Sequence, residues 1–360
     1  MRIGTRGSAL ALAQARLVAG WLGGAEIVVV RTRGDTQNPQ GGNGHGARIL
    51  AGTSTGAHAG ASKREPRGED KSRWVAELEQ ALLTGEIDLA VHSAKDVPGE
   101  LAAGLGLLGA PARATPADAL IGAHSLEDLP RDARVGTSSV RRAAQLLAVR
   151  DDLEIVSLRG NVDTRLRKLA EEVIGSGKRG ARPSRDDSGH GGVSGGHSDG
   201  GDPRESASLH AIVLASAGLK RLGRERDIGC LLDPARFVPA PGQGALALQA
   251  RIADASVREA VEPILDKDTS ACLLAERAVA HALGASCNTP LGAHAVPAGC
   301  GCLNMRAWIG LPDGSEWIAD ELLGGFYDPE ELGTRVAQRL EAAGARGLLE
   351  RAAEMAVEHP

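Results

Sequence analysis

The chain has 360 residues, which at roughly 100–200 residues per domain predicts two or three domains. Hydrophobic residues make up 42% of the chain and aromatic residues only 2%, so its cores must be built from aliphatic side chains. The formal net charge is −5 at pH 7. Because nucleic-acid-binding domains are typically basic and rich in aromatic stacking residues, we expect no nucleic-acid partner.

The sequence also argues against a membrane protein and against a secreted one. No run of about 18 apolar residues occurs, so we expect no membrane span. The residues that follow Met1 lack the pattern of a secretory leader. Five cysteines are an odd number, which argues against a disulfide framework and for a reducing compartment. Cys300 and Cys302 lack the spacing of a zinc site. We therefore expect a cytoplasmic protein without a metal.

Strands and helices alternate along the first two thirds of the chain. Ser8 can cap a helix over residues 9–21. The spacing of apolar residues predicts further helices over residues 74–83 and 162–173. Short apolar runs predict strands over residues 27–30, 87–91, 155–158 and 211–215. This alternation favours open α/β sheets with mostly parallel strands, in which ligands bind beyond the carboxyl ends of the strands.

The C-terminal part of the chain has a different order of elements. Asp268 or Thr269 can cap a helix that runs to about residue 283. Short strands are expected around residues 291–296, 305–309 and 317–322, followed by helices near 329–342 and 346–357. This order predicts a small α+β domain. Two segments rich in glycine, serine and charged residues, 38–73 and 175–208, are interpreted as mobile insertions. The first could also act as a lid.

Lys95 and Asp96 stand side by side in segment 91–98, directly after a predicted strand. They should therefore lie at the carboxyl end of that strand, where a ligand would bind. A carboxylate at this place could stabilise a cation or transfer a proton. The alternative is a helix-capping aspartate beside a solvated lysine, and the local sequence leaves both interpretations open.

Arginines follow the ends of several predicted strands. In segment 135–142 a glycine ends a strand and hydroxyl residues open a helix, whose N-terminus can bind an anion. Surface charge is the alternative interpretation of this segment. Five arginines occupy such strand-end positions: Arg6, Arg141, Arg159, Arg165 and Arg221. Together they predict a cationic cleft for carboxylates or phosphates. No P-loop or GxGxxG motif occurs, so a nucleotide is not favoured.

Two loops in the last third of the chain contain further candidates. Segment 237–245 is rich in proline and glycine and is interpreted as a crossover between domains. Segment 284–292 is a loop of small residues that displays Cys287 after a helix. A lone cysteine is more often structural than reactive, and the residues themselves do not decide between the two roles.

Taken in order, these segments resemble the porphobilinogen deaminase family, also called hydroxymethylbilane synthase. The matching segments are TRGSALALAQA, VAELEQALL, DLAVHSAKDVP, GTSSVRRAAQL, LRGNVDTRL, ASAGLKRLG, PAPGQGALALQAR and ERAVAHALGASCNTPLGAHA. The resemblance covers nearly the whole chain except the two insertions. It implies two periplasmic-binding-protein-like α/β domains plus a small C-terminal α+β domain. Domain 1 would comprise residues 1–112 and 244–263, domain 2 residues 117–239, and domain 3 residues 266–360 with the cysteine loop.

The family condenses four porphobilinogen molecules head to tail with loss of ammonia, and hydrolysis then gives hydroxymethylbilane. The resemblance implies a dipyrromethane cofactor attached to Cys287 through a thioether. It also implies that Asp96, with Lys95 beside it, stabilises an azafulvenium cation and assists proton transfer. The cofactor-binding residues would be Cys287, Arg6, Ser8, Lys95, Asp96, Ser139, Arg141, Arg142, Arg159 and Arg165. The substrate-binding residues would be Arg6, Arg159, Arg165, Arg221 and Gln243.

Two places depart from the family pattern. Residues 69–74 stand where the family often has a Gly/Lys-rich stretch and a phenylalanine, which leaves the role of Trp74 open. Ala285 replaces a glycine that is common two residues before the cysteine. We expect porphobilinogen as the substrate, a product that passes to the next tetrapyrrole enzyme, and a monomer. The alternatives are a non-catalytic anion-binding protein of the same two-domain architecture and an inactive paralogue.

Overall fold

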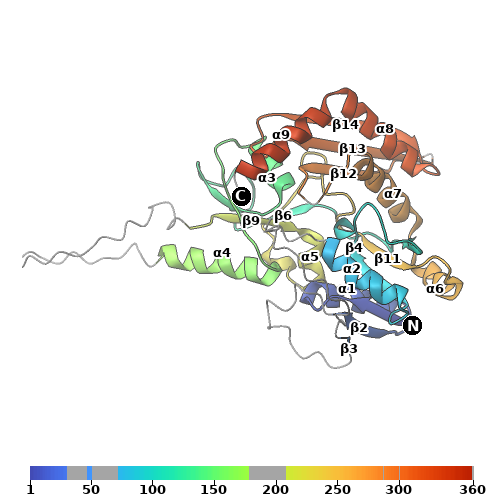
Figure 1. Ribbon diagram of the computed structural model, residues 1–360. Helices are drawn as coiled ribbons and strands as arrows, with labels where there is room; N and C mark the ends of the chain where they lie inside the picture. The colour runs from blue at the N-terminus through green and yellow to red at the C-terminus, as the bar shows by residue number, and fades with distance from the viewer. Residues whose placement is uncertain (31–46, 51–71, 178–207, 287, 300, 359–360) are drawn as a thin grey trace, which may run out of the picture.

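The computed structural model describes residues 1–30, 47–50, 72–177, 208–286, 288–299 and 301–358. Three β-sheets with their helices organise these residues (Figure 1). The two predicted insertions lie largely outside the described residues, and Cys287 lies outside them as well. None of the helices in the described ranges is long and apolar enough to cross a membrane.

The first sheet contains six strands. They are β1 (Arg2–Thr5), β2 (Glu26–Val30), β3 (Ala47–Leu50), β4 (Leu89–Ser93), β5 (Leu105–Gly109) and β11 (Leu246–Arg251). Their order in the sheet is β3-β2-β1-β4-β11-β5. The first four strands pair in parallel, but β11 is antiparallel to both β4 and β5. The prediction of mostly parallel pairing therefore fails at the strand that returns to the sheet from late in the chain.

Three helices cover the two faces of the first sheet: α1 (Ala9–Trp21), α2 (Ser72–Leu83) and α6 (Ala255–Val261). Alternate residues of β4 face opposite layers, as the two-residue period of a strand requires. Leu89 and Val91 pack in a core with residues of α1 and α6. Ala90 packs in a second core with residues of α2. The predicted helix at residues 9–21 is confirmed over its full length.

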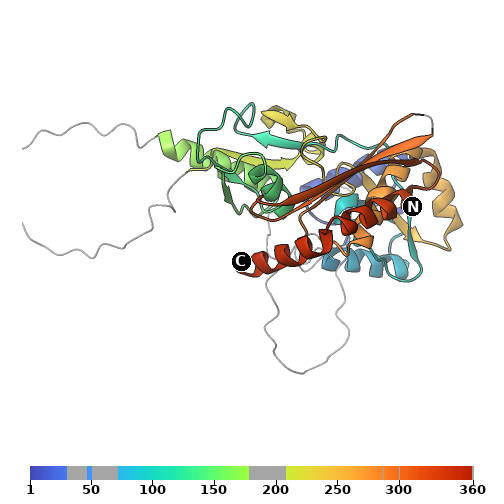
Figure 2. The same ribbon diagram turned by 90° about the horizontal axis from the view of Figure 1, so that it is seen from above.

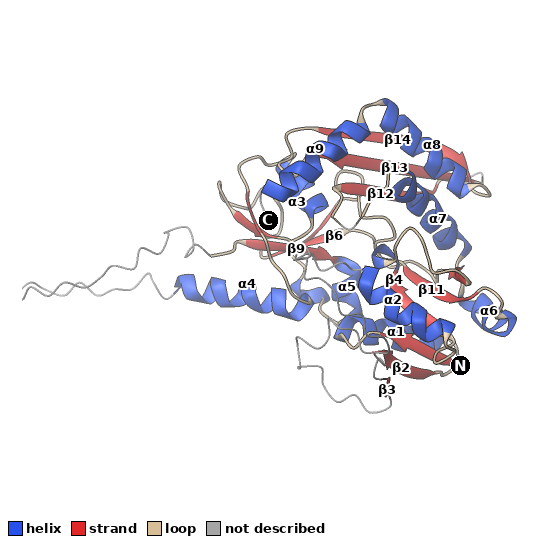
Figure 3. Ribbon diagram, viewed as in Figure 1, coloured by secondary structure: helices blue, strands red, loops and turns tan. Residues whose placement is uncertain are grey.

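The second sheet contains five strands in the order β10-β6-β9-β7-β8. Their bounds are β6 (Asp118–Ile121), β7 (Arg134–Gly136), β8 (Glu154–Val156), β9 (Ala211–Ala215) and β10 (Cys230–Leu232). One apolar core lies on each of its two faces. The helices that follow its strands are α3 (Val140–Leu147), α4 (Val162–Gly177) and α5 (Ser216–Arg221). Figure 3 shows α4 projecting away from the rest of the chain.

The third sheet is antiparallel and contains β12 (Leu291–Pro297), β13 (Cys302–Gly310) and β14 (Trp317–Gly325). Its helices are α7 (Lys267–Ala282), α8 (Pro329–Ala342) and α9 (Ala345–Glu358). One apolar core joins these helices to the sheet, and Figure 2 shows α8 and α9 running along it. The cap of α7 is Asp266, whose carboxylate accepts from the amide of Thr269. The helix therefore begins slightly earlier than the sequence predicted.

Candidate active site

The end of β1 and the beginning of α1 position the first site residues. Arg6 directly follows β1. Ser8 is the N-cap of α1, because its Oγ accepts a hydrogen bond from the amide of Ala11 at 3.3 Å. The buried Thr5 hydroxyl donates to the carbonyl of the same Ala11 at 3.1 Å. These two bonds tie the turn that carries Arg6 and Ser8 to the first turn of the helix.

Lys95 and Asp96 lie in a 3₁₀ turn, Ala94–Asp96, directly after β4. Gly242 of the crossover segment lies against this turn with φ +72°, and an added Cβ would come 2.9 Å from the Cβ of Ala94. Glycine is therefore needed for both the conformation and the close approach. Arg277 of α7 donates to the three carbonyl groups that follow the turn, at 3.2, 2.8 and 3.2 Å.

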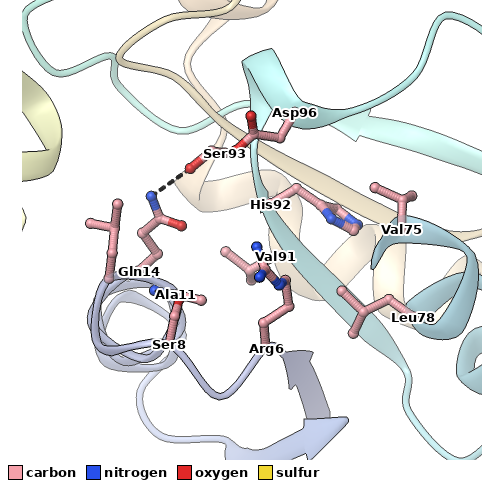
Figure 4. Close-up of a pocket in the computed structure, with 11 residues that line it drawn as sticks. Arg6, Ser8, Ala11, Gln14, Val75, Leu78, Val91, His92, Ser93 and Asp96 are labelled. Carbon is pink, nitrogen blue, oxygen red and sulfur yellow. Dashed lines mark hydrogen bonds between the residues drawn. The ribbon is translucent and has the colours of Figure 1, made fainter. Parts of the chain in front are cut away.

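A pocket opens where β1 and β4 end, between α1 and α2 (Figure 4). Arg6, Ser8 and Asp96 all line it, so the structure brings these three predicted residues together. The other lining residues are Leu10, Ala11, Gln14, Val75, Leu78, Val91, His92 and Ser93. Gln14 crosses the pocket edge and donates to Ser93 Oγ at 2.8 Å. The pocket thus combines a cation, a carboxyl group and an aliphatic wall.

His92 is the titratable lining residue that sequence reasoning did not assign to the site. Its Nε2 lies 2.9 Å from Gln249 Oε1, on the neighbouring strand β11. Burial lowers the pKa of His92 to about 4, although the hydrogen bond to Gln249 and the charge of Asp96 act in the opposite direction. The ring is therefore neutral at physiological pH.

A buried carboxylate in the second sheet holds two of the predicted arginines. Asp118 begins β6 and is only 1% exposed. Its Oδ2 accepts from Arg141 at 2.8 Å, and its Oδ1 accepts from Arg142 Nε at 2.9 Å. Burial by itself would raise the pKa of Asp118, but the two arginine charges hold it well below the ordinary value. Arg141 and Arg142 are thus internal ion-pair partners as well as candidates for ligand binding.

Gln243 connects this cluster to the turn at the end of β4. Its side-chain oxygen accepts from Lys95 Nζ and from Arg142, each at 3.3 Å. Its side-chain nitrogen donates to Asp118 Oδ1 at 2.8 Å and to the carbonyl of Pro116 at 2.6 Å. Gln243 is fully buried. The predicted substrate-binding glutamine therefore lies between the two sheets, bonded to a predicted residue on each side.

The remaining predicted arginines have different surroundings. Arg159 is exposed, and its guanidinium makes no hydrogen bond or ion pair with any described residue. Arg165 is half-buried, and its Nε has no hydrogen-bond partner in the described part of the chain. Burial, with a smaller contribution from Arg142, lowers the pKa of Arg165. Arg221 donates to the carbonyl of Gly244 at 2.7 Å, and burial lowers its pKa to about 10.

Three further predicted features can be placed only in part. Ser139 is the N-cap of α3, with its Oγ accepting from the amide of Arg142 at 3.4 Å. Cys287 lies outside the described residues, and so does the side chain of Trp74. Beside Cys287, the amide of Ser286 donates to the hydroxyl of Thr289 at 2.8 Å. Among the residues that the structure describes, no group of three or more side chains could hold a metal ion.

Glu276 of α7 forms a second buried centre that sequence reasoning missed. Its carboxylate accepts two hydrogen bonds from Arg113, at 2.6 and 3.0 Å, and one from the amide of Gly242 at 2.6 Å. The amide of Ala295 and the ring of His294 complete the set. Burial would raise the pKa of Glu276, but the charges and hydrogen bonds of Arg113 and His294 together outweigh burial and lower it to about 2. Glu276 thus ties the third sheet to the crossover segment.

The missed residues give weak signals in the sequence. Asp118 opens an otherwise apolar strand, and His92 follows the apolar run of another. A polar residue in a buried strand predicts a hydrogen-bonded partner but does not name it. Glu276 stands within the segment that resembles the family, yet nothing in its local pattern indicates a partner more than 160 residues away, at Arg113.

Comparison with known protein families decides the assignment of the chain. The family model described as porphobilinogen deaminase, dipyromethane cofactor binding domain, matches residues 1–47, 49–176 and 203–259. The model of the porphobilinogen deaminase C-terminal domain matches residues 270–342. The chain belongs to the porphobilinogen deaminase family. The family resemblance expected from the ordered segments is therefore confirmed, as is the fold class.

Relatives in the porphobilinogen deaminase family align over nearly the full length of the chain. The porphobilinogen deaminase of Trichlorobacter lovleyi is 36% identical, and the alignment covers 100% of this chain and 98% of that protein. That of Thermus thermophilus is 38% identical, with coverages of 96% and 97%. Among solved structures, a YaeC-family lipoprotein from Enterococcus faecalis covers 74% of this chain and 89% of its own, at 13% identity and a TM-score of 0.31. That likeness is too low to support an argument.

Proposed function

We propose that the protein condenses four porphobilinogen molecules head to tail, releases ammonia at each addition, and yields hydroxymethylbilane for tetrapyrrole biosynthesis. It would thus be a transferase. The observation that carries the proposal is the match of both family models, which together span most of the chain. The pocket supports it, because Asp96 and Arg6 line one space at the ends of neighbouring strands.

The charged groups of the site suit a dipyrromethane that carries acetate and propionate groups. Arginine pairs with carboxylates through two parallel hydrogen bonds. Two buried guanidinium nitrogens, Arg141 Nε and Arg165 Nε, have no hydrogen-bond partner among the described residues, and each N–H would donate to a carboxylate oxygen of the ligand. The bound group would serve as the primer on which the product is assembled, and Cys287 would anchor it through a thioether.

We propose distinct roles for the arginines according to their surroundings. Arg159 and Arg165 would bind carboxylate groups directly, since neither makes an ion pair with Asp118, and Arg6 would bind them from the pocket that it lines. Arg141 and Arg142 would bind with the donors that Asp118 leaves available, because a guanidinium has five N–H groups. Ser8 and Ser139 would add hydrogen bonds at the helix N-termini. Arg221 and Gln243 would contact the substrate from the crossover side, where both already hold backbone groups.

Asp96 would act on the porphobilinogen substrate itself. Loss of ammonia from porphobilinogen leaves an azafulvenium cation, and a carboxylate in a pocket with an aliphatic wall stabilises a cation strongly. Asp96 would also accept and return protons at the reacting carbon. Lys95 stands next to it and donates to Gln243, which fixes the direction of the turn. The proposed site therefore combines Lys95 and Asp96 on one side of Gln243 with Arg142 on the other.

We also propose domain boundaries, an oligomeric state and a cellular location for the protein. Domain 1 would comprise residues 1–112 and 244–263, domain 2 residues 117–239, and domain 3 residues 266–360. The protein would act as a cytoplasmic monomer and pass its linear product to the next enzyme of tetrapyrrole biosynthesis, since the linear product still has to be closed into a ring.

Intact-mass measurement tests the cofactor, and ammonia release tests the reaction. The purified protein should exceed its sequence mass by one dipyrromethane, and Cys287→Ser should lack this excess. Asp96→Asn should keep the added mass but release ammonia at least about 100-fold more slowly, because it loses the negative charge. Active protein without added mass would refute the cofactor assignment. An Asp96→Asn variant with unchanged turnover would refute the role of the carboxylate.

A further inference from the structure

His92 lies at the end of a hydrogen-bond chain that begins at a backbone amide. The amide of Ala102 donates to Glu79 Oε1 at 3.3 Å, and the side-chain nitrogen of Gln249 donates to the same oxygen at 2.8 Å. Gln249 then presents its oxygen to His92 Nε2 at 2.9 Å. The members come from α2, β11 and β4, and the three side chains are buried.

The direction of this chain determines the tautomer of the histidine. A backbone amide can only donate, so Glu79 Oε1 acts as an acceptor toward Ala102. The amide group of Gln249 therefore turns its nitrogen to Glu79 and its oxygen to His92. An oxygen of an amide can only accept, so His92 must carry a hydrogen on Nε2. In a neutral imidazole the other nitrogen, Nδ1, then has a lone pair and no hydrogen.

The free acceptor of His92 belongs to a residue that lines the candidate pocket. Nδ1 makes no hydrogen bond with any described residue. His92 lines the same space as Arg6 and Asp96, and Figure 4 shows the three side chains around it. The pocket therefore offers a positive group, a carboxyl group and a neutral acceptor. Pyrroles carry one ring N–H each, so a ligand of two linked pyrroles presents two donors to this space.

We propose that His92 is a substrate-positioning residue that accepts a hydrogen bond from a pyrrole N–H through Nδ1, with Gln249 and Glu79 holding its tautomer. The inference rests on the proposed function, because it takes the pyrrole as the ligand of the pocket. It assigns to Asp96 the developing positive charge and to His92 a neutral ring N–H. A neutral acceptor would hold a pyrrole without competing with Asp96 for the cation.

Two matched substitutions separate this role from a structural one. In His92→Asn the side-chain oxygen can take the place of Nδ1, but the link to Gln249 is lost. In His92→Gln the longer side chain can keep that link, but no acceptor remains at the Nδ1 position. We expect kcat/KM with porphobilinogen to be at least about tenfold higher in His92→Asn than in His92→Gln. Thermal unfolding should rank the two variants in the opposite order, because only His92→Asn leaves the side-chain oxygen of Gln249 without its hydrogen bond.

A purely structural histidine predicts that His92→Gln is both the more stable and the more active variant, and this result would overturn the inference. If neither variant folds, ¹⁵N NMR of the wild-type holoenzyme decides, with the signal of His92 identified by its absence from a His92→Phe variant or by through-bond assignment. We expect an unprotonated Nδ1 and a protonated Nε2 at neutral pH, and either the other tautomer or a charged ring overturns the inference. Wild-type protein without turnover would instead refute the proposed function.

Discussion

Replacing Glu276 by glutamine tests how strongly the third sheet is tied to the crossover segment. The carboxylate is fully buried and accepts five hydrogen bonds, two of them from Arg113. Glutamine has nearly the same shape but replaces one acceptor oxygen with an NH₂ group. That group would face donors, and Arg113 would lose its counter-charge.

The structure sets the size of the effect in two ways. The pKa of Glu276 falls from an ordinary 4.5 to about 2, which corresponds to roughly 3 kcal/mol in favour of the charged form. Removing one partner of a buried ion pair typically costs about 3–5 kcal/mol. We therefore expect Glu276→Gln to lower the free energy of unfolding by about 3–5 kcal/mol at pH 7.

Urea denaturation followed by tryptophan fluorescence can measure this loss, because Trp308 is buried against Ala144 and Val238. The folded pKa of Glu276 lies below its unfolded value, so its contribution is complete above about pH 4.5 and is lost as the pH falls toward 2. The difference between wild type and variant should shrink over that range. Glu321→Gln, which breaks a surface pair with Arg306, is the control and should cost less than about 1 kcal/mol. A loss of less than about 1 kcal/mol for Glu276→Gln at pH 7 would refute this reasoning.

Three other outcomes follow from the described contacts. Asp118→Asn should lower the free energy of unfolding by about 3–5 kcal/mol, since it leaves Arg141 and Arg142 buried without a countercharge; urea denaturation with wild-type stability would contradict this. Gly242→Ala should cost about 1–3 kcal/mol and reduce kcat, because its φ of +72° is strained for alanine and the new Cβ would press on Ala94; thermal unfolding and turnover check both effects. Burial raises the pKa of the Cys272 thiol to about 12, so peptide mapping after iodoacetamide treatment at pH 8 should find it unmodified in the folded protein, and rapid labelling would show that the site opens.

Local signals predicted the elements well where they were strong. Ser8 followed by a largely apolar run predicted the helix at residues 9–21, and the structure confirms it with its cap. The strand predicted at residues 87–91 is instead β4, Leu89–Ser93. Ile87 is buried against α2 but precedes the strand, and Asp88 bonds the amide of Arg2 at 2.7 Å. An apolar residue just outside a strand cannot be distinguished from one inside it by periodicity alone.

The sequence predicted which residues belong to the site better than it predicted the hydrogen bonds and ion pairs between them. Strand-end positions placed Arg6 and Asp96 together, and the pocket contains both. Nothing in the sequence indicated that Asp118 forms ion pairs with Arg141 and Arg142, because that carboxylate lies 23 and 24 residues away from them along the chain. Parallel pairing was predicted from the alternation of strands and helices. The sequence of β11, which joins the first sheet only after the whole second sheet, does not indicate in which direction that strand runs. The roles of the site residues in catalysis stay predictions.

The position of β11 has a consequence for the order in which the chain can fold. This strand, residues 246–251, lies between β4 and β5, whose residues precede it by well over one hundred positions. During synthesis, β4 and β5 therefore emerge long before the strand that separates them, and their edges stay unpaired in the meantime. Such distant pairing slows folding and exposes strand edges to other chains. Substitutions that delay the second sheet should thus increase aggregation through the first one, even though they lie far from it.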